Sequence, residues 1–332
     1  MRQAIALATS PDAPRGANPR VGCVVIDAGG SVVGTGYHLG AGTAHAEVVA
    51  LAQAGERARG GTAVVTLEPC RHTGRTGPCT LALLAAGIHR VVIGMADPTA
   101  RAGGGAGDLR AAGVEVIEEV LVEECTAVNS DWAHVQRHDR PYVTVKTAMS
   151  LDGRVADAGG GPTAITAGAA RAWVHDLRTR VDAILVGTNT VRVDDPQLTA
   201  RAPDGSALPR QPLRVVMGHS EVRPNARLRG EPGEWLHVRT REPRAALEIL
   251  RARDVAHVLI EGGPQIIRAF LAADRVDQVC WFVSPILLGG GPMALGPLAV
   301  PLEASTMRLE VIGDDVLMIT SGLVPQSSAG ST

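Results

Sequence analysis

The first 125 residues alternate between short strand-like runs and helix-like segments. Apolar, β-branched runs bounded by glycine turns are typical of buried strands, and alanine- and leucine-rich segments closed by glycine are typical of helices. This alternation predicts helices on both faces of a sheet, an α/β layer architecture. We expect strands at 21–27, 31–36, 63–67, 90–94 and 114–117, the first two joined as a hairpin, and helices at 44–54, 79–86 and 108–112.

A polar stretch at 131–141 interrupts the pattern, and we interpret it as a helix end and a linker. The sequence therefore predicts one domain at 1–140, a second at 141–325 and a disordered Ser/Gly-rich tail at 326–332. In the second domain we expect strands at 142–147, 183–186, 213–217, 234–238, 255–260, 278–283 and 316–320, and helices at 168–179, 243–251 and 264–272.

Length and composition support this division and exclude several classes of protein. The 332 residues exceed the roughly 250–300 at which a single core tends to split. The net charge of −2 and the pI near 6.6 give no basic field for a nucleic-acid partner. No apolar run reaches the roughly 18 residues that a membrane span needs, and the N-terminus does not resemble a signal peptide. These features predict a cytoplasmic protein with no membrane partner.

Cysteine and lysine are both used sparingly. An odd number of scattered cysteines, five in all, argues against a disulfide framework. Of the 32 basic residues, only Lys146 is a lysine. A compact ammonium differs from a planar guanidinium, so Lys146 is either a functional exception or a chance survivor.

The first candidate site combines a histidine, a glutamate and two cysteines. His45-Ala46-Glu47 opens a predicted helix, and Pro69-Cys70 is followed by Pro78-Cys79. This is the arrangement of zinc deaminases, in which one imidazole and two thiolates leave the fourth position for water. Glu47 would then move the proton of that water. A lone histidine or a cysteine pair is more often structural, but the combination at helix starts predicts Zn²⁺ held by His45, Cys70 and Cys79.

The second candidate site is a set of strand–glycine–helix turns. The segments 146–154, 186–191 and 261–265 each leave a predicted strand through small residues. Such turns let a phosphate approach the backbone and the next helix N-terminus, which predicts a nucleotide cradle. A tight turn without a ligand explains any one of them equally well. No G-x-G-x-x-G is present, which argues against a Rossmann dehydrogenase.

Three stretches of the first half, 18–25, 45–48 and 66–79, resemble the bifunctional deaminase–reductases of riboflavin biosynthesis. Eight residues separate Cys70 from Cys79, whereas cytidine deaminases usually have two. The resemblance implies a cytidine-deaminase-like three-layer α/β/α domain. It also implies hydrolysis of the 2-amino group of 2,5-diamino-6-ribosylamino-4(3H)-pyrimidinone 5′-phosphate, with Asn18, His72 and Arg75 binding this pyrimidine ribonucleotide.

The segments 146–154, 193–199 and 261–264 resemble the reductase half of the same family. This half has a dihydrofolate-reductase-like α/β fold and uses NADPH to reduce the ribosyl chain to ribityl. Lys146 would then lie near the carbon that receives hydride. The resemblance further implies that Arg178, Leu198, Arg201 and Glu261 bind substrate, and that Ala148, Thr190, Asp194, Gly263, Pro264, Gln265, Ile266 and Ile267 bind NADPH.

One segment departs from the family pattern. Where the family has a serine and a tryptophan, residues 160–166 place Pro162 and Ala164. The alternative interpretation is therefore a working deaminase joined to a degenerate or repurposed reductase. A more distant alternative is a zinc-stabilised binding module without catalysis. Members of this family tend to form dimers or tetramers, which predicts a homo-oligomer.

Overall fold

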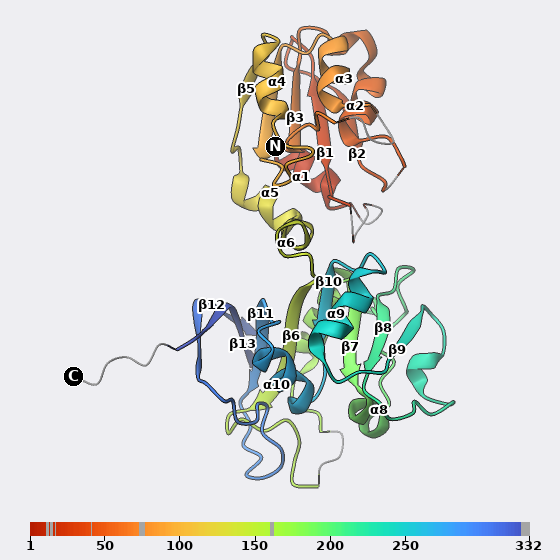
Figure 1. Cartoon of the computed structure of the whole chain (residues 1–332), viewed down its shortest axis with the longest axis vertical. Helices are drawn as coiled ribbons and strands as arrows, with labels where there is room; N and C mark the ends of the chain where they lie inside the picture. Colours follow the sequence, from red (N-terminus) through yellow and green to blue (C-terminus); the bar gives the residue numbers. More distant parts are fainter. Residues whose placement is uncertain are drawn as a thin grey trace, which may run out of the picture. The chain divides into compact units, whose positions relative to one another are not determined.

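The computed structural model describes residues 1–10, 13, 16, 18–40, 42–72, 77–159 and 163–326. The chain divides into a first unit, Met1–Asp139, and a second unit, Arg140–Thr332 (Figure 1). Each unit has its own sheet and its own core. The predicted tail at 326–332 lies outside the described residues except for Gln326.

The first unit is built on a five-stranded sheet with the order β2-β1-β3-β4-β5. The hairpin pair is antiparallel, β1 is also antiparallel to β3, and the β3–β4 and β4–β5 pairs are parallel. Residues alternate strictly between the two faces, so Cys23 and Val65 face one layer of helices while Val24 and Val64 face the other. The strands are β1 (Gly22–Ile26), β2 (Val32–Tyr37), β3 (Thr62–Leu67), β4 (Arg90–Met95) and β5 (Glu115–Ile117).

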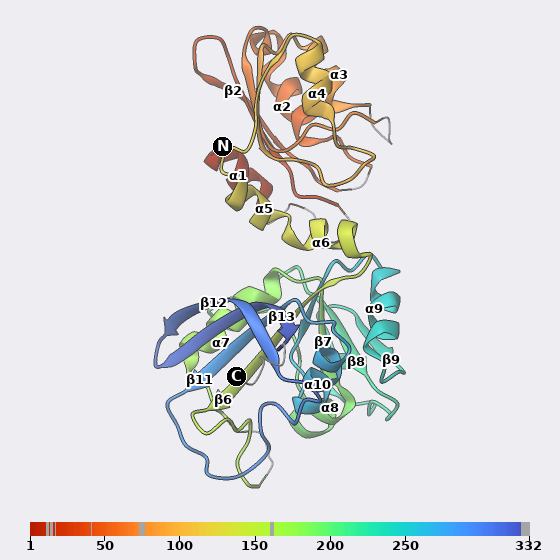
Figure 2. The same cartoon turned by 60° about the vertical axis from the view of Figure 1, so that its left-hand side comes forward.

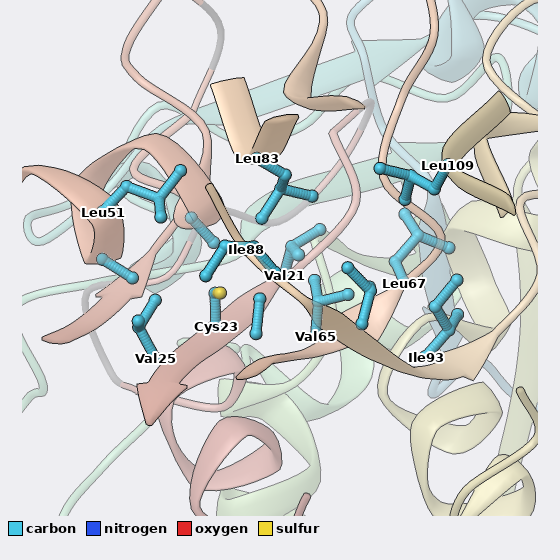
Figure 3. Packing of buried hydrophobic residues seen from close by; sticks show 14 of the residues in the cluster. Val21, Cys23, Val25, Leu51, Val65, Leu67, Leu83, Ile88, Ile93 and Leu109 are labelled. Atoms are coloured by element: carbon cyan, nitrogen blue, oxygen red, sulfur yellow. The ribbon is translucent and has the colours of Figure 1, made fainter. Parts of the chain in front are cut away.

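Helices cover both faces of this sheet and complete the α/β/α sandwich. In Figure 3, Leu51 and Leu83 point from their helices toward Cys23, Val25 and Val65 on the strands. On this face lie α2 (Ala46–Ala54), α3 (Cys79–Ala85) and α4 (Gly105–Ala111), whereas α1 (Arg2–Ala8) packs on the opposite face. The remaining helical segments are η1 (Gly55–Ala58), α5 (Val122–Val128) and α6 (Ser130–His138).

Two glycines bring α2 unusually close to the sheet. A Cβ on Gly36 would lie 2.3 Å from the carbonyl oxygen of Ala46, and one on Gly34 would lie 2.0 Å from that of Ala50. Only a residue without a side chain fits at such distances. The first turn of α2, which carries His45 and Glu47, is therefore pressed directly against β2.

The second unit contains an eight-stranded sheet with the order β12-β13-β11-β6-β10-β7-β8-β9. The five strands from β6 to β9 in this order are parallel, as is the β6–β11 pair, while β13 is antiparallel to both β11 and β12. The strands are β6 (Tyr142–Ser150), β7 (Ala183–Gly187), β8 (Leu213–Met217), β9 (Trp235–Val238), β10 (His257–Ile260), β11 (Gln278–Ser284), β12 (Leu302–Ile312) and β13 (Asp315–Pro325).

Helices flank this sheet on both sides (Figure 2). One face packs on α9 (Pro243–Arg251) and α10 (Pro264–Ala272), and the other packs on α7 (Gly168–Thr179) and α8 (Thr188–Asp194), beside the short helix η2 (Arg227–Arg229). Because parallel strands end at one edge, the turns after β7, β8, β9 and β10 gather there. The predicted α/β fold of both halves is confirmed.

Several segments differ from the sequence expectation, which did not include the helices α1 and α5. The stretch 131–141, expected to be a helix end and linker, is mostly the helix α6, since its apolar residues Trp132, Ala133 and Val135 are buried. The edge strand β12 was not expected, because its polar and apolar residues are largely exposed. Among the described residues, no helix combines the length and the apolarity needed to cross a membrane.

Candidate active sites

His45, Cys70 and Cys79 come together in the first unit. His45 is the N-cap of α2, Cys70 follows β3, and Cys79 is the first residue of α3. The Nδ1 atom of His45 lies 3.1 Å from Sγ of Cys79 and 3.5 Å from Sγ of Cys70. The three ligand atoms lie within 4.8 Å of one another. Tetrahedral zinc, with Zn–N near 2.0 Å and Zn–S near 2.3 Å, requires such separations, so this donor set fits the ion.

The two thiols share a hydrogen bond. A hydrogen bond from the Cys79 thiol lowers the pKa of Cys70 to about 4, and the same bond raises the pKa of Cys79. One proton is therefore held between the two sulfurs, and a dication binding here would displace it. The hydrogen bond to Cys70 also raises the pKa of His45.

Glu47 lies in the first turn of α2 and is only 3% exposed. Burial raises the pKa of its carboxyl above the ordinary value, and the negative charge of Cys70 acts in the same direction. Its side chain lines the same cavity as His45 and Cys70. This is the environment in which a carboxyl group can both accept and return a proton near neutral pH.

The cavity around these groups measures about 410 Å³. Asn18 and His72, both expected to bind substrate, line it. The Nδ1 atom of His72 is buried and has no hydrogen-bond partner among the described residues, so it is available to a ligand. Arg75 lies outside the described residues. Sequence analysis missed six further lining residues: His38, Asp97, Thr99, Arg101, Trp132 and Gln136.

A buried carboxylate ties the opposite wall of this cavity to the cysteine segment. Glu68 accepts backbone N–H groups from Asp97 at 3.1 Å, Gly104 at 3.0 Å and Ala106 at 2.9 Å. It stands two residues before Cys70. The loop that carries Asp97, Thr99 and Arg101 is thus fixed against the proposed ligand segment.

In the second unit, Arg178 and Glu261 form a bidentate ion pair. Nε of Arg178 donates to Oε1 of Glu261 at 2.8 Å, and a terminal nitrogen donates to Oε2 at 2.7 Å. The other terminal nitrogen donates to the Thr199 carbonyl at 3.0 Å. Both side chains are largely buried, at 15% and 11% exposure. Most of the N–H groups of Arg178 therefore donate hydrogen bonds to Glu261 and Thr199 within this chain.

Lys146 stands beside this pair on β6. Its Nζ lies 5.6 Å from the centroid of the Phe282 ring, within cation–π range. Burial lowers the pKa of Lys146, although the charge of Glu261 opposes this effect. Burial alone would raise the pKa of Glu261, but Arg178 and Lys146 more than offset it, so the net shift is downward. The cluster therefore contains two cations, Lys146 and Arg178, and one anion, Glu261.

The other expected substrate residues lie close to the ion pair. Arg201 donates to Thr199 Oγ1 at 3.0 Å and to the Gly205 carbonyl at 2.8 Å. Leu198 is buried and adopts φ 57°, a left-handed conformation that a leucine rarely takes. His175, which sequence analysis missed, has a buried Nδ1 without a hydrogen-bond partner among the described residues.

A cleft of about 820 Å³ follows the edge where the parallel strands end. Gly187 closes β7 in this wall, and a Cβ there would lie 2.9 Å from Ile266, so the glycine keeps the turn narrow. The N-terminal turn of α10, with Pro264 at its first position, also lines the cleft. Such a cradle beside a helix N-terminus fits a dinucleotide phosphate.

The expected cofactor residues divide into two groups. Thr190, Gly263, Pro264, Gln265 and Ile266 line the cleft, whereas Ala148, Asp194 and Ile267 are not among its described lining residues. The Ile267 side chain belongs to the core beneath α10. Sequence analysis missed the basic residues of the wall, His219, Arg241 and Arg268, since isolated arginines in this arginine-rich chain give no signal.

Comparisons with known proteins agree with both sites. Residues 1–95 match the model of the cytidine and deoxycytidylate deaminase zinc-binding region, and residues 141–318 match the RibD C-terminal domain. The riboflavin biosynthesis protein RibD of Mycobacterium tuberculosis is 46% identical over 307 residues, which cover 90% of each chain. The chain belongs to the RibD family. It is a bifunctional riboflavin-pathway enzyme with a zinc-dependent deaminase half and an NADPH-dependent reductase half.

Other RibD proteins extend the similarity to the whole structure. The RibD of Escherichia coli is 39% identical over 311 residues, covering 84% of each chain. A diaminohydroxyphosphoribosylaminopyrimidine deaminase/5-amino-6-(5-phosphoribosylamino)uracil reductase from Thermotoga maritima superposes with a TM-score of 0.85 at 34% identity, covering 97% of each chain. The RibD of Acinetobacter baumannii gives a TM-score of 0.83 at 33% identity, covering 96% of this chain and 97% of that one.

Proposed function

We propose that the first unit hydrolyses the 2-amino group of 2,5-diamino-6-ribosylamino-4(3H)-pyrimidinone 5′-phosphate and releases ammonia. The observation that carries this proposal is the His45, Cys70 and Cys79 donor set facing the buried Glu47 in one cavity. Zinc held by these residues supplies a Lewis acid that brings the pKa of a bound water to about 7.

Residues that line the cavity transfer the proton and bind the substrate. Glu47 takes a proton from the attacking water as the C–O bond forms. It then returns this proton to the departing nitrogen as the C–N bond breaks, so that ammonia leaves. Asn18 and His72 hold the pyrimidine, since both line the cavity and His72 has an unused buried nitrogen. Arg75, which lies outside the described residues, also binds the substrate.

Glu47→Gln separates catalysis from metal binding, because Glu47 is not in the ligand set. We expect zinc content to stay at the wild-type level while ammonia release falls about 10²–10⁴-fold, the usual contribution of a general acid–base group. Glu56→Gln, at an exposed position just after α2, is the matched control. Unchanged turnover in Glu47→Gln would show that Glu47 is not the proton carrier.

We propose that the second unit reduces the ribosyl chain of the deaminated product to the ribityl chain of 5-amino-6-ribitylaminouracil 5′-phosphate. NADPH would supply the hydride, and Thr190 and the turn Gly263–Ile266, which line the 820 Å³ cleft, would hold its phosphates. Lys146 gives a proton to the ring oxygen as the ribose opens and the glycosidic nitrogen loses its proton to form a C=N bond. Hydride then adds to C1′, and the nitrogen regains a proton.

Neighbouring residues position this lysine and the substrate. Glu261 holds the Lys146 ammonium in place and is itself fixed by Arg178. Arg201, with Leu198 beside it, faces the substrate phosphate, because a guanidinium pairs well with phosphate oxygens. Ala148 and Asp194 complete the dinucleotide site, and Ile267 contributes through its backbone.

The test uses purified protein supplied with deaminated substrate and NADPH. Steady loss of NADPH absorbance, together with formation of the ribityl product, supports the proposal. No NADPH consumption by a protein that still releases ammonia would instead favour a degenerate reductase. That outcome would point to the segment 160–166, of which residues 160–162 lie outside the described residues.

We also propose that the protein is cytoplasmic and forms a dimer or tetramer of identical chains. A reducing compartment would keep the Cys70 and Cys79 thiols available for zinc. The two units match RibD proteins along their whole length, and the second unit has an exposed apolar strand at its sheet edge.

A further inference from the structure

Arg101 lines the cavity of the first unit and has no partner for its charge. It is the one arginine or lysine among the described residues of the cavity wall. Its guanidinium makes no ion pair or hydrogen bond within the described part of the chain, whereas that of Arg71 lies 4.0 Å from the carboxylate of Asp108. An exposed guanidinium at a cavity, without a carboxylate partner, is available to an anionic ligand.

The backbone that carries Arg101 is held in place. The hydroxyl of Thr99 accepts a hydrogen bond from the N–H of Ala102 at 3.2 Å. Ala102 itself is buried in one cluster with Cys70 and Cys79, two of the proposed zinc ligands. Arg101 therefore projects from a fixed loop whose next residue packs against the metal site, so its long side chain can reach a substrate that occupies the cavity.

The acidic side chains of the same cavity do not neutralise Arg101. They are Glu47, Glu68 and Asp97. Glu68 accepts three backbone N–H groups, and Asp97 accepts the N–H of Thr99 at 2.8 Å and its hydroxyl at 2.6 Å. A phosphate monoester carries about 1.5 to 2 negative charges at pH 7, so carboxylates repel it and a guanidinium attracts it. Charge therefore favours Arg101 as the place where a phosphate group binds.

We propose that Arg101 binds the 5′-phosphate of the nucleotide that the first unit deaminates. This inference rests on the proposed deaminase function and adds a residue that makes the cavity prefer the phosphorylated substrate to its nucleoside. Asn18 and His72 hold the pyrimidine, which leaves the phosphate to be held separately. A guanidinium suits this task because its planar fork can donate to two phosphate oxygens at once.

The test compares the nucleotide with its dephosphorylated nucleoside as substrates of the zinc-loaded, full-length protein. Arg101→Met should lower kcat/KM for the nucleotide about 10–100-fold, the range expected for the loss of charge-assisted hydrogen bonds, and should change that for the nucleoside less than about twofold. Arg101→Lys should retain part of the preference because it retains the charge. Arg59→Met removes an exposed arginine outside the cavity and is the matched control, which should keep the wild-type preference.

Calorimetry in the Glu47→Gln background measures binding without turnover. Adding Arg101→Met should weaken nucleotide binding about 10–100-fold, and salt should weaken nucleotide binding more strongly while Arg101 is present, because salt screens exposed charges. The proposal is overturned if Arg101→Met leaves the preference for the nucleotide unchanged, or if it weakens binding of the nucleotide and the nucleoside equally. Absence of ammonia release by the wild type would instead overturn the proposed deaminase function, and the calorimetry would still decide the role of Arg101.

Discussion

Replacing Lys146 with methionine should stabilise the second unit while abolishing reduction. Lys146 and Arg178 place two positive charges around the single carboxylate of Glu261 in a largely buried cluster. Methionine keeps the volume of the lysine stem and leaves a neutral Arg178–Glu261 pair. Replacement of buried charges by apolar groups stabilises by about 1–4 kcal/mol, and we take about 1 kcal/mol because Lys146 is only partly buried. For a unit of this size the melting temperature should rise by about 2–4 °C.

Differential scanning calorimetry at pH 7 measures this shift, and NADP⁺ identifies the transition of the second unit because it stabilises that transition selectively. The folded pKa of Lys146 lies below the unfolded value. Between those two values the unfolded chain binds more protons, so the stability of the wild type rises with pH. The advantage of Lys146→Met should therefore shrink in alkaline buffer.

Glu261→Gln should have the opposite effect on the stability of the second unit. It leaves both cations without a carboxylate, which should cost about 3 kcal/mol. If Lys146→Met melted below the wild type at pH 7, as Glu261→Gln should, the assignment of an excess buried positive charge would be refuted.

Three further outcomes follow from the same geometry. Lys146→Arg keeps the charge but changes its shape, so NADPH consumption should fall while ammonia release is unchanged; equal rates would make the lone lysine incidental. Gly105→Ala would set a Cβ 1.9 Å from the Pro69 carbonyl, beside Cys70. It should cost about 1–3 kcal/mol in urea unfolding and weaken zinc retention. Removing zinc with a chelator should lower the melting temperature of the first unit and leave that of the second unchanged.

Periodicity and spacing predicted most of the elements that carry the sites. Helix α7 was predicted at 168–179 and is observed at Gly168–Thr179, because its apolar residues recur along one helical face. The His45, Cys70 and Cys79 group was also predictable, since the order and chemistry of its donors are specific even when their distances are unknown. What periodicity cannot supply is how distant strand ends meet.

The residues that sequence analysis missed share a physical cause. His38, Trp132 and His219 reach their cavities from separate parts of the chain, a loop after β2, helix α6 and a loop after β8, and only tertiary packing brings them there. Arg178 shows a further limit, because its ion pair with Glu261 and its hydrogen bond to the Thr199 carbonyl could not be predicted from the sequence. Edge strand β12 was missed because most of its side chains are exposed, so burial does not impose an alternating pattern there.

The hydrogen bonds that Glu68 accepts from its loop have an evolutionary consequence. Its carboxylate binds amide hydrogens of the main chain, and every residue type except proline offers one. Mutation can therefore change the side chain at 101 without breaking the hydrogen bonds that Glu68 accepts from the loop. The deaminase pocket can drift toward a different aromatic amine while its metal chemistry stays intact, so selection can act on specificity and on reactivity separately.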